Sequence, residues 1–271
     1  MNNYNYLMNN NIYQSKEIQN FTVISNDFVN SEHFLMTVQL SKPLLPILPG
    51  QFVEIKVDDE PSVFLRRPIS VHDVDSTNNT ISFVIRVCGK GTEKLSRFRS
   101  GDTVNIIYPL GKGFTVEQGK YLLIGGGCGL APLYYLARKL NEINIFPDIL
   151  IGARNEEAVF DLRKYQSLGN VHITTEDGSM GECGFATQHS ILEKHLNFTH
   201  ICTCGPEAMM KTVAQYAAKH GIHCEVSLEN TMACGVGACL CCVTETVDGH
   251  HVCVCTEGPV FDAEKLKFSK M

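Results

Sequence analysis

Residues 234–242 read Cys-Gly-Val-Gly-Ala-Cys-Leu-Cys-Cys, and Cys253 and Cys255 follow shortly afterwards. Half of the chain's 12 cysteines therefore lie in this C-terminal run. The spacing C-x4-C-x2-C, followed by a later cysteine, is typical of a plant-type [2Fe–2S] cluster. The glycines and Ala238 are small, so the backbone can wrap closely and direct its N–H groups at the sulfurs. The run therefore predicts an iron–sulfur cluster.

Two other interpretations of these cysteines stay open. A structural zinc site also uses four thiolates, but its ligands usually come as two C-x2-C pairs with a long spacer, whereas the first gap here is four residues. In the third interpretation the cysteines are small buried residues without a ligand. The spacing favours the cluster over both.

The composition restricts the class of protein. The chain has 271 residues, of which 44% are hydrophobic and 19% charged, with a net charge of −6. This length allows about two domains and a small third module. The acidic balance gives no basis for binding nucleic acid or an anionic membrane. No long apolar run or secretory signal is visible, so the cysteines indicate metal ligation in a reducing compartment, and we expect a cytoplasmic protein.

The N-terminal part of the chain divides into a tail and a β-rich segment. Residues 1–16 are rich in Asn and Tyr without an apolar period, so we expect a disordered tail. Residues 17–116 contain short β-branched or alternating runs separated by turn residues, which predicts an antiparallel β-barrel. Its expected strands lie near residues 21–23, 34–38, 52–57, 81–87 and 103–107.

From residue 117 to residue 227, apolar strands alternate with helical patterns. Strands are expected at 120–124, 148–151, 171–174, 199–203 and 223–227, and helices at 130–140, 156–166, 187–195 and 206–219. This alternation predicts a parallel sheet with crossover helices. Residues 228–271 form the remaining cysteine module. The expected fold class is thus a β barrel plus an α/β domain, with a small C-terminal module.

The first motif with chemical meaning is Leu65-Arg66-Arg67-Pro68-Ile69-Ser70. An arginine fork beside a rigid proline, with a hydroxyl three residues on, suits a phosphate or diphosphate. Taken alone, the hexapeptide is explained equally well as a basic surface turn. Downstream, Val84-Ile85-Arg86 adds a strand, and Gly91-Thr92 adds a turn whose amides can face an anion. Together the three pieces favour a bound flavin nucleotide.

A second motif, Gly125-Gly126-Gly127-Cys128-Gly129, lies between an apolar strand and a helix. Glycines there permit close backbone approach, and a helix N-terminus favours a pyrophosphate. The strict G-x-G-x-x-G pattern fails, because Leu130 or Pro132 occupies the third glycine position. A plain strand-to-helix turn therefore stays open. Arg154 near the end of the next strand leaves NADP open beside NAD.

A third motif, Cys204-Gly205-Pro206, also stands between a strand and a helix. The carboxyl ends of parallel strands gather at one edge, which is where ligands bind in such sheets. Gly and Pro are also ordinary at a helix start, so the motif is weak by itself. The sequence has no G-x-S-x-G elbow, HExxH pair, Walker loop or EF-hand loop, and we predict no catalytic side chain.

In their order, the motifs RRPIS, GKGT, GGGCGLAP, CGPEAMM and MACGVGACLCC with VCTEGPVFD resemble those of the electron-transfer subunits of class 1B dihydroorotate dehydrogenases. That family consists of ferredoxin-reductase-type flavoproteins with FAD and a [2Fe–2S] cluster. The resemblance runs from about residue 17 to the end of the chain. MACGVGAC and VCTEGPVFD are its most specific parts, since the wider ferredoxin-reductase superfamily shares the other motifs.

The resemblance implies a role for each motif. Arg67, Pro68, Ile69 and Ser70 would hold FAD, and Val84, Ile85, Arg86, Gly91 and Thr92 would complete its contacts. Gly125, Gly126, Gly127, Gly129, Cys204, Gly205 and Pro206 would shape the nicotinamide nucleotide site. The cluster ligands would be Cys234, Cys239, Cys242 and Cys255.

The choice of Cys255 over Cys253 also comes from the resemblance. Cys255 stands directly before Thr256-Glu257-Gly258-Pro259, as the family's ligand stands before its x-x-Gly-Pro. The residues alone do not separate the two, because cysteines two apart on a strand face the same side.

The resemblance finally implies electron transfer in de novo pyrimidine biosynthesis. Dihydroorotate would be oxidised at the FMN of a separate catalytic subunit, and electrons would pass through this chain's cluster and FAD to NAD+ in a hetero-oligomer, expected to be a heterotetramer. The segments leave no barrel of roughly 250 residues for FMN. The alternative is a related FAD/[2Fe–2S] NAD(P)H oxidoreductase subunit of the ferredoxin:NADP+ or sulfide/sulfite type. A zinc module or redox sensor would bind no flavin.

Overall fold

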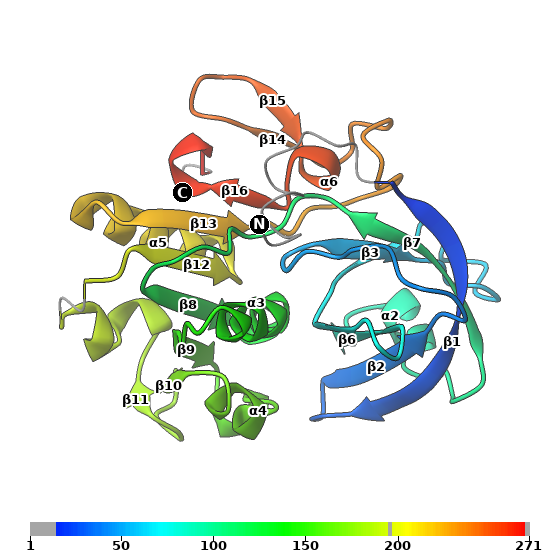
Figure 1. Cartoon of the computed structure of the whole chain (residues 1–271), viewed down its shortest axis with the longest axis horizontal. Helices are drawn as coiled ribbons and strands as arrows, with labels where there is room; N and C mark the ends of the chain where they lie inside the picture. The colour runs from blue at the N-terminus through cyan, green and yellow to red at the C-terminus, as the bar shows by residue number, and fades with distance from the viewer. Residues whose placement is uncertain (1–14, 195–196, 269–271) are drawn as a thin grey trace.

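A computed structural model of the chain describes residues 15–194 and 197–268, so the tail expected at residues 1–16 lies outside the described part except for its last two residues. Two seven-stranded sheets stand side by side, and a two-stranded hairpin lies at one end of the molecule (Figure 1). In both sheets, the order of the strands in space differs from their order in the sequence.

The first sheet is antiparallel and curls around an apolar core that includes Phe21, Phe34 and Phe83. Its strands follow the order β4-β3-β7-β1-β2-β6-β5. They are β1 (Glu17–Phe28), β2 (His33–Gln39), β3 (Phe52–Ile55), β4 (Arg67–Ser70), β5 (Asp73–Asp75), β6 (Thr80–Arg86) and β7 (Thr103–Leu110), with the short helix α2 (Lys90–Leu95) after β6. The expected barrel-type domain is confirmed, in the form of a half-barrel.

The second sheet has the order β11-β10-β9-β8-β12-β13-β16 and is parallel except at its last strand. Its strands are β8 (Tyr121–Gly126), β9 (Asp148–Ala153), β10 (Asn170–Thr175), β11 (Glu182–Cys183), β12 (His200–Cys204), β13 (His223–Ser227) and β16 (Val260–Asp262). The helices α3 (Ala131–Glu142), α4 (Leu162–Gln166) and α5 (Glu207–His220) connect and cover them. The expected parallel sheet with crossover helices is confirmed.

The predictions of two helices, at 156–166 and 187–195, are wrong. The helix expected at 156–166 is divided into a 3-10 turn (Glu156–Ala158) and α4, because Asp161 between them adopts a left-handed conformation with φ 52°. At 187–195 the described residues form two 3-10 turns instead. There the His189 ring accepts the N–H of Ile191, so a local side-chain bond replaces the helical one.

Helix α3 fastens the half-barrel to the parallel sheet. The Nδ1 atom of His72 lies 2.9 Å from the carbonyl oxygen of Ala131 at the start of the helix. One turn further on, the Tyr135 hydroxyl donates to the Ile47 carbonyl at 3.2 Å, and Arg138 forms an ion pair with Asp73 at 3.0 Å. The two sheets are therefore held in one frame by contacts along a single helix.

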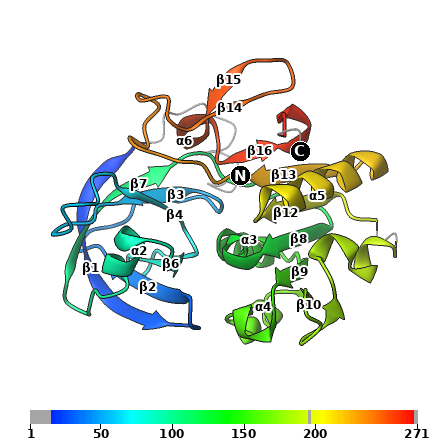
Figure 2. The same ribbon diagram turned by 180° about the vertical axis from the view of Figure 1, so that it is seen from behind.

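The C-terminal segment contacts both sheets. It contains the hairpin β14 (Val243–Glu245) and β15 (His251–Cys253), then the one-turn helix α6 (Val254–Glu257), and finally β16, which pairs with β13. Figure 2 shows α6 lying over the ends of β3 and β7. An apolar layer there joins Phe52 and Leu110 of the half-barrel to Cys242, Val254 and Cys255.

Candidate cofactor sites

The arginine motif and the glycine turn after β6 form one site on the half-barrel. Strand β4 carries Arg67 to Ser70 and pairs with β3, so that Ile69 stands opposite Val53. The side chain of Arg67 runs beside Gly91 of α2, where an added Cβ would lie 3.0 Å from the Arg67 Cδ atom. Two motifs that are distant in sequence are therefore in contact.

The two neighbouring arginines have different environments. Arg66 donates to the carbonyl and the side-chain oxygen of Asn105 at 3.1 and 2.6 Å, which ties the loop to β7. Arg67 donates only to carbonyls of its own loop, to Leu65 at 2.8 Å and to Arg66 at 3.1 Å. Among the described residues no carboxylate pairs with Arg67 within salt-bridge distance. Its positive charge therefore fits a phosphate group.

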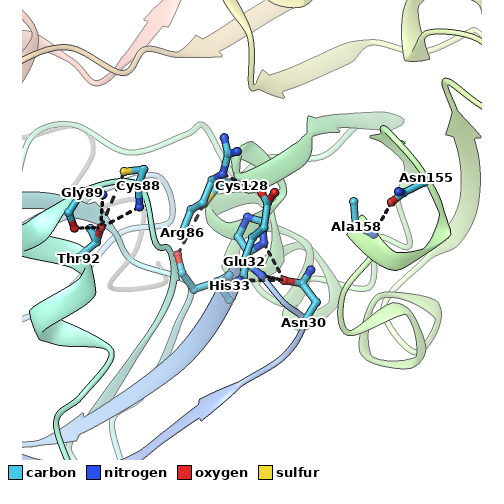
Figure 3. A network of polar contacts seen from close by, with 11 residues as sticks. Asn30, Glu32, His33, Arg86, Cys88, Gly89, Thr92, Cys128, Asn155 and Ala158 are labelled. Carbon is cyan, nitrogen blue, oxygen red and sulfur yellow. Dashed lines mark hydrogen bonds and ion pairs between the residues drawn. The ribbon is translucent and has the colours of Figure 1, made fainter.

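Thr92 shapes the turn that precedes α2. Its buried Oγ1 atom accepts the N–H groups of Cys88 and Gly89 at 3.0 and 3.2 Å and donates to the Gly89 carbonyl at 3.0 Å (Figure 3). The hydroxyl is fully used inside the turn. Thr92 therefore acts on a bound nucleotide through the shape of the loop.

The three motif residues of strand β6, Val84, Ile85 and Arg86, lie in three different environments. The side chain of Ile85 lies in the half-barrel core, whereas Val84 belongs to the core of the parallel sheet. Arg86 forms an exposed ion pair with Glu32 at 3.0 Å (Figure 3). The thiol of Cys128, in the glycine turn after β8, lies 3.8 Å from the Val84 carbonyl. The flavin-side strand and the nucleotide-side turn therefore meet.

The two motifs on the parallel sheet also form one site. Gly125 of β8 is in register with Cys204 of β12. A Cβ on Gly129 would lie 2.3 Å from the Cys204 carbonyl oxygen, and one on Gly126 would lie 2.9 Å from the Pro206 Cδ atom. Gly129 is required because it packs against the backbone of Cys204 and Gly205, and Gly126 because the Pro206 and Met209 side chains lie against it.

Gly127 differs from the other glycines of this turn. It has a φ of +54°, and nothing lies within 4 Å of the position where a Cβ would stand. The turn continues as a 3-10 turn (Gly127–Leu130) into α3. The backbone at Gly127 is therefore open to close approach by a ligand, which fits a nucleotide diphosphate at this edge of the sheet.

The thiols beside this site are neutral. Burial raises the pKa of the Cys128 thiol to about 12, and the Glu229 carboxylate adds to the rise. Burial also raises the pKa of the Cys204 thiol. Neither thiol is a nucleophile near neutral pH, since the thiolate is the reactive form.

Each of the four expected cluster ligands accepts a backbone N–H group. The Sγ atom of Cys234 accepts from Val236 at 3.4 Å, that of Cys239 from Cys241 at 3.5 Å, that of Cys242 from Cys255 at 3.4 Å, and that of Cys255 from Gly237 at 3.2 Å. Within residues 15–194 and 197–268, no such bond is found for Cys241 or Cys253. Amides directed at sulfur fit thiolates that carry the charge of an iron–sulfur cluster.

The cysteine side chains lie in two groups. Cys234 lies beside Cys239, and Cys242 lies beside both Cys253 and Cys255. In the described part of the chain, no three His, Cys, Asp or Glu side chains are grouped closely enough for a single metal ion. Two groups of thiols fit a [2Fe–2S] cluster, in which two cysteines bind each iron, and this arrangement by itself does not separate Cys253 from Cys255.

The electrostatics of the loop differ between its two ends. Burial opposes ionisation of Cys234, but hydrogen bonds from the N–H groups of Val236 and Cys239 outweigh it and lower the pKa of the thiol to about 6. Burial and the neighbouring Cys242 side chain raise the pKa of Cys255 to about 12.

The expectation that Cys253 and Cys255 share the face of a strand is wrong. Strand β15 ends at Cys253, and Cys255 lies in α6. Both thiols lie in the same buried layer as Cys242, but among the described residues only the Cys255 sulfur accepts a backbone N–H group, from Gly237. Pattern reading alone also missed the buried carboxyl group of Glu54, which an alternating strand would place in solvent.

No helix among the described residues is long and apolar enough to span a membrane.

Comparisons with known proteins agree with this arrangement. Residues 229–267 match the iron–sulfur cluster binding domain of dihydroorotate dehydrogenase B, and residues 123–215 match the oxidoreductase NAD-binding domain. The chain is 40% identical, over 79% of its length and 84% of the relative, to the dihydroorotate dehydrogenase B (NAD+) electron transfer subunit of Shouchella clausii. The subunit of the same name from Caldanaerobacter subterraneus is 39% identical over 91% of this chain and 97% of the relative.

A solved structure gives the same result for the fold. The NADH-dependent reduced ferredoxin-NADP oxidoreductase, known for flavin-based electron bifurcation, superimposes with a TM-score of 0.83 and 27% identity. The match covers 92% of this chain and 90% of the other.

The half-barrel, the parallel sheet and the cysteine loop together define a ferredoxin-reductase-like FAD- and NAD-binding oxidoreductase with an iron–sulfur module. Within that class, the chain belongs to the family of dihydroorotate dehydrogenase B (NAD+) electron transfer subunits. The family resemblance drawn from the motifs is confirmed.

Proposed function

We propose that this chain receives electrons from an FMN-containing dihydroorotate dehydrogenase catalytic subunit and delivers them to NAD+ in pyrimidine biosynthesis. The observation that carries the proposal is the position of the cysteine loop, which packs on β3 and β7 of the half-barrel. One chain thereby places four amide-supported thiolates beside a flavin-type site, and the name of its relatives describes the same task.

In this proposal, each of three segments of the chain binds one cofactor. Residues 17–116 bind FAD, residues 117–227 bind the nicotinamide nucleotide, and residues 228–271 bind the cluster, with residues 1–16 as a tail. The matches at 123–215 and 229–267 support the last two of the three binding segments. Strand β16 pairs with β13, so the cluster segment also extends the sheet of the nucleotide segment.

The chain's own residues bind, orient and shield. Arg67 and the turn at Gly91-Thr92 would hold the flavin diphosphate, and Pro68, Ile69, Ser70, Val84, Ile85 and Arg86 would complete the contacts with FAD. Gly125, Gly126, Gly127 and Gly129 with Cys204, Gly205 and Pro206 form the nicotinamide nucleotide site. Cys234, Cys239, Cys242 and Cys255 bind the irons. When bound, FAD and the cluster supply the conversion between single electrons and a hydride, so no acid–base side chain is required.

The partner is proposed to dock at the tip of the cysteine loop. Val236 and Leu240 flank the ligands there and are 46% and 65% exposed. Apolar side chains beside a redox centre fit a surface that a catalytic subunit covers, in a heterotetramer of two subunits of each kind. All twelve cysteines are free of disulfides, which supports a cytoplasmic setting.

Co-purification with a candidate catalytic subunit tests the proposal. The complex is expected to reduce NAD+ when dihydroorotate is added. The isolated chain is expected to oxidise NADH with a dye and to form no orotate. A colourless chain, or orotate production by the chain alone, would contradict the proposal. Transfer from NAD(P)H to ferredoxin without any response to dihydroorotate would favour the related oxidoreductase subunit instead.

A further inference from the structure

Glu54 is a fully buried carboxyl group in the middle of β3. The residue is 0% exposed and stands opposite Pro68 of the flavin strand β4. Within the described ranges, neither of its side-chain oxygens has a hydrogen-bond partner. Buried carboxyl groups are normally paired or hydrogen-bonded, because burial without compensation costs free energy.

The carboxyl group faces the cysteine loop. A Cβ on Gly235, the residue after Cys234, would lie 2.9 Å from the Glu54 Cγ atom and 3.4 Å from its Oε1 atom. The same Gly235 position lies 3.1 Å from the Leu110 Cδ1 atom, and Leu110 belongs to the apolar layer that also contains Phe52 and Cys242. Glu54 therefore lies between the half-barrel and the cluster loop.

Among the residues that the structure describes, no cation pairs directly with this carboxyl group. Arg66 donates at 3.3 Å to the backbone carbonyl of Glu54, not to its carboxylate, and directs its second nitrogen to Asn105. Burial raises the pKa of Glu54 to about 7, while the charges of Arg66 and Arg67 oppose the rise and Cys234 adds to it. Among the described residues, the Leu110 Cδ1 atom lies 3.1 Å from the same Gly235 Cβ position that Glu54 approaches, so an apolar side chain stands beside the carboxyl group there.

An apolar residue would serve the fold better at this position. Phe52 and Leu110 fill the same layer without unsatisfied polar atoms. Replacing a buried unpaired charge with an apolar group of similar size is usually neutral or stabilising. The position of Glu54 therefore points to a purpose outside folding.

We propose that Glu54 is a positioning residue for the cluster. The carboxylate of Glu54, which lies beneath Gly235, lowers the reduction potential of the irons bound at Cys234 and the other cysteine ligands. The inference rests on the proposed cluster function. Reduction adds negative charge, and a carboxylate in a water-excluded layer opposes that addition more strongly than it would in water. Net charge near an iron–sulfur cluster is one of the properties that set its potential.

The test compares Glu54→Gln and Glu54→Met with the unchanged full chain carrying its FAD and cluster. The midpoint potential of the cluster is measured at pH 8.5 by a redox titration followed by electron paramagnetic resonance. Both variants are expected to shift the potential upward. The control is Glu264→Gln, which removes the same charge from an exposed position of the cluster segment and is expected to leave the potential unchanged.

An unchanged potential in both Glu54 variants, with full iron content, overturns the inference. Loss of iron from a folded chain in both variants assigns Glu54 a purely structural role and overturns it as well. Thermal unfolding adds a second readout, since Glu54→Met is expected to raise the midpoint temperature of the cluster-free chain and a lower one contradicts the argument. A wild-type chain without a cluster signal would refute the proposed function itself, which keeps the two failures distinguishable.

Discussion

The amide of Gly237 donates a hydrogen bond to the sulfur of Cys255 at 3.2 Å, although the two residues belong to different elements. Gly237 has a φ of +80° within the loop, and Cys255 lies in α6. The bond joins the two parts of the cysteine pattern and fixes the fourth sulfur from outside its own helix.

This relationship predicts different results for the two late cysteines. Cys255→Ser is expected to abolish the cluster, because it removes the sulfur that the loop amide supports. Cys253→Ser is expected to keep it, since its sulfur accepts no amide among the described residues. Iron content and the visible spectrum of the purified variants measure the outcome. The reverse pattern of iron content would refute the ligand assignment.

Gly237→Ala is expected to weaken retention of the cluster. The left-handed conformation costs a non-glycine residue about 1 kcal/mol, and the new methyl would lie 3.1 Å from the Thr256 Cγ2 atom. Gly249→Ala is a matched control, because Gly249 has a φ of +81° with nothing within 4 Å of an added Cβ. The rate of cluster loss to an iron chelator should rise in the first variant only. Equal loss in both would attribute the effect to backbone strain in general.

Gly91→Ala is expected to lower the affinity for FAD roughly tenfold, equivalent to about 1.4 kcal/mol. Its methyl would lie 3.0 Å from the Arg67 Cδ atom and displace the guanidinium that is proposed to hold the diphosphate. Gly89→Ala, in the same loop, meets nothing within 4 Å and should retain the flavin. Fluorescence titration of the flavin-free chain with FAD gives both dissociation constants. Unchanged affinity in Gly91→Ala would separate this turn from the flavin site.

Thr92→Val is expected to lower the free energy of unfolding by about 1 kcal/mol, because two part-buried amides lose the hydroxyl that accepts from them. Those amides belong to Cys88 and Gly89. Thr92→Ser retains the hydroxyl and should recover most of the loss. Urea unfolding of both variants provides the comparison, and equal stability of the Val and Ser variants would show that the hydroxyl is not needed.

The pKa of Glu54 predicts a pH dependence of stability. Because its folded pKa is raised to about 7 from an ordinary value of 4.5, the folded chain binds the proton more tightly than the unfolded chain. The contribution is complete below about pH 4.5 and is lost as the pH rises to about 7, by on the order of 3 kcal/mol. In the cluster-free chain, the stability difference between wild type and Glu54→Gln should therefore change across this window. A constant difference would contradict the raised pKa.

Periodic signals predicted the frame of the molecule but not its connections. Strands such as β8 and β9 contain apolar runs, so their type follows from the sequence. Strand β4 has only four residues, including a proline, and exists because β3 offers it a partner. The pairing of β16 with β13 is likewise tertiary, since it joins the cysteine segment to the other sheet.

The site was predictable as a set of motifs but not as a set of contacts. The glycine-rich turns indicate that another part of the chain packs closely against their backbone. Only the fold shows that Gly129 packs on Cys204 and Gly91 on Arg67. Glu54 stands in Phe-Val-Glu-Ile, where alternation suggests a solvated side chain. Its burial comes from the loop around Gly235, which packs on it from far along the chain.

The contacts of α3 with His72, Ile47 and Asp73 have a consequence for how turnover proceeds. Domains joined by small polar interfaces usually swing relative to each other, but here the helix that begins the nucleotide segment places Tyr135 in the half-barrel core. Three contacts along one helix therefore oppose a swing of one sheet against the other. A change in the spacing of the sites on the two sheets would have to break these contacts.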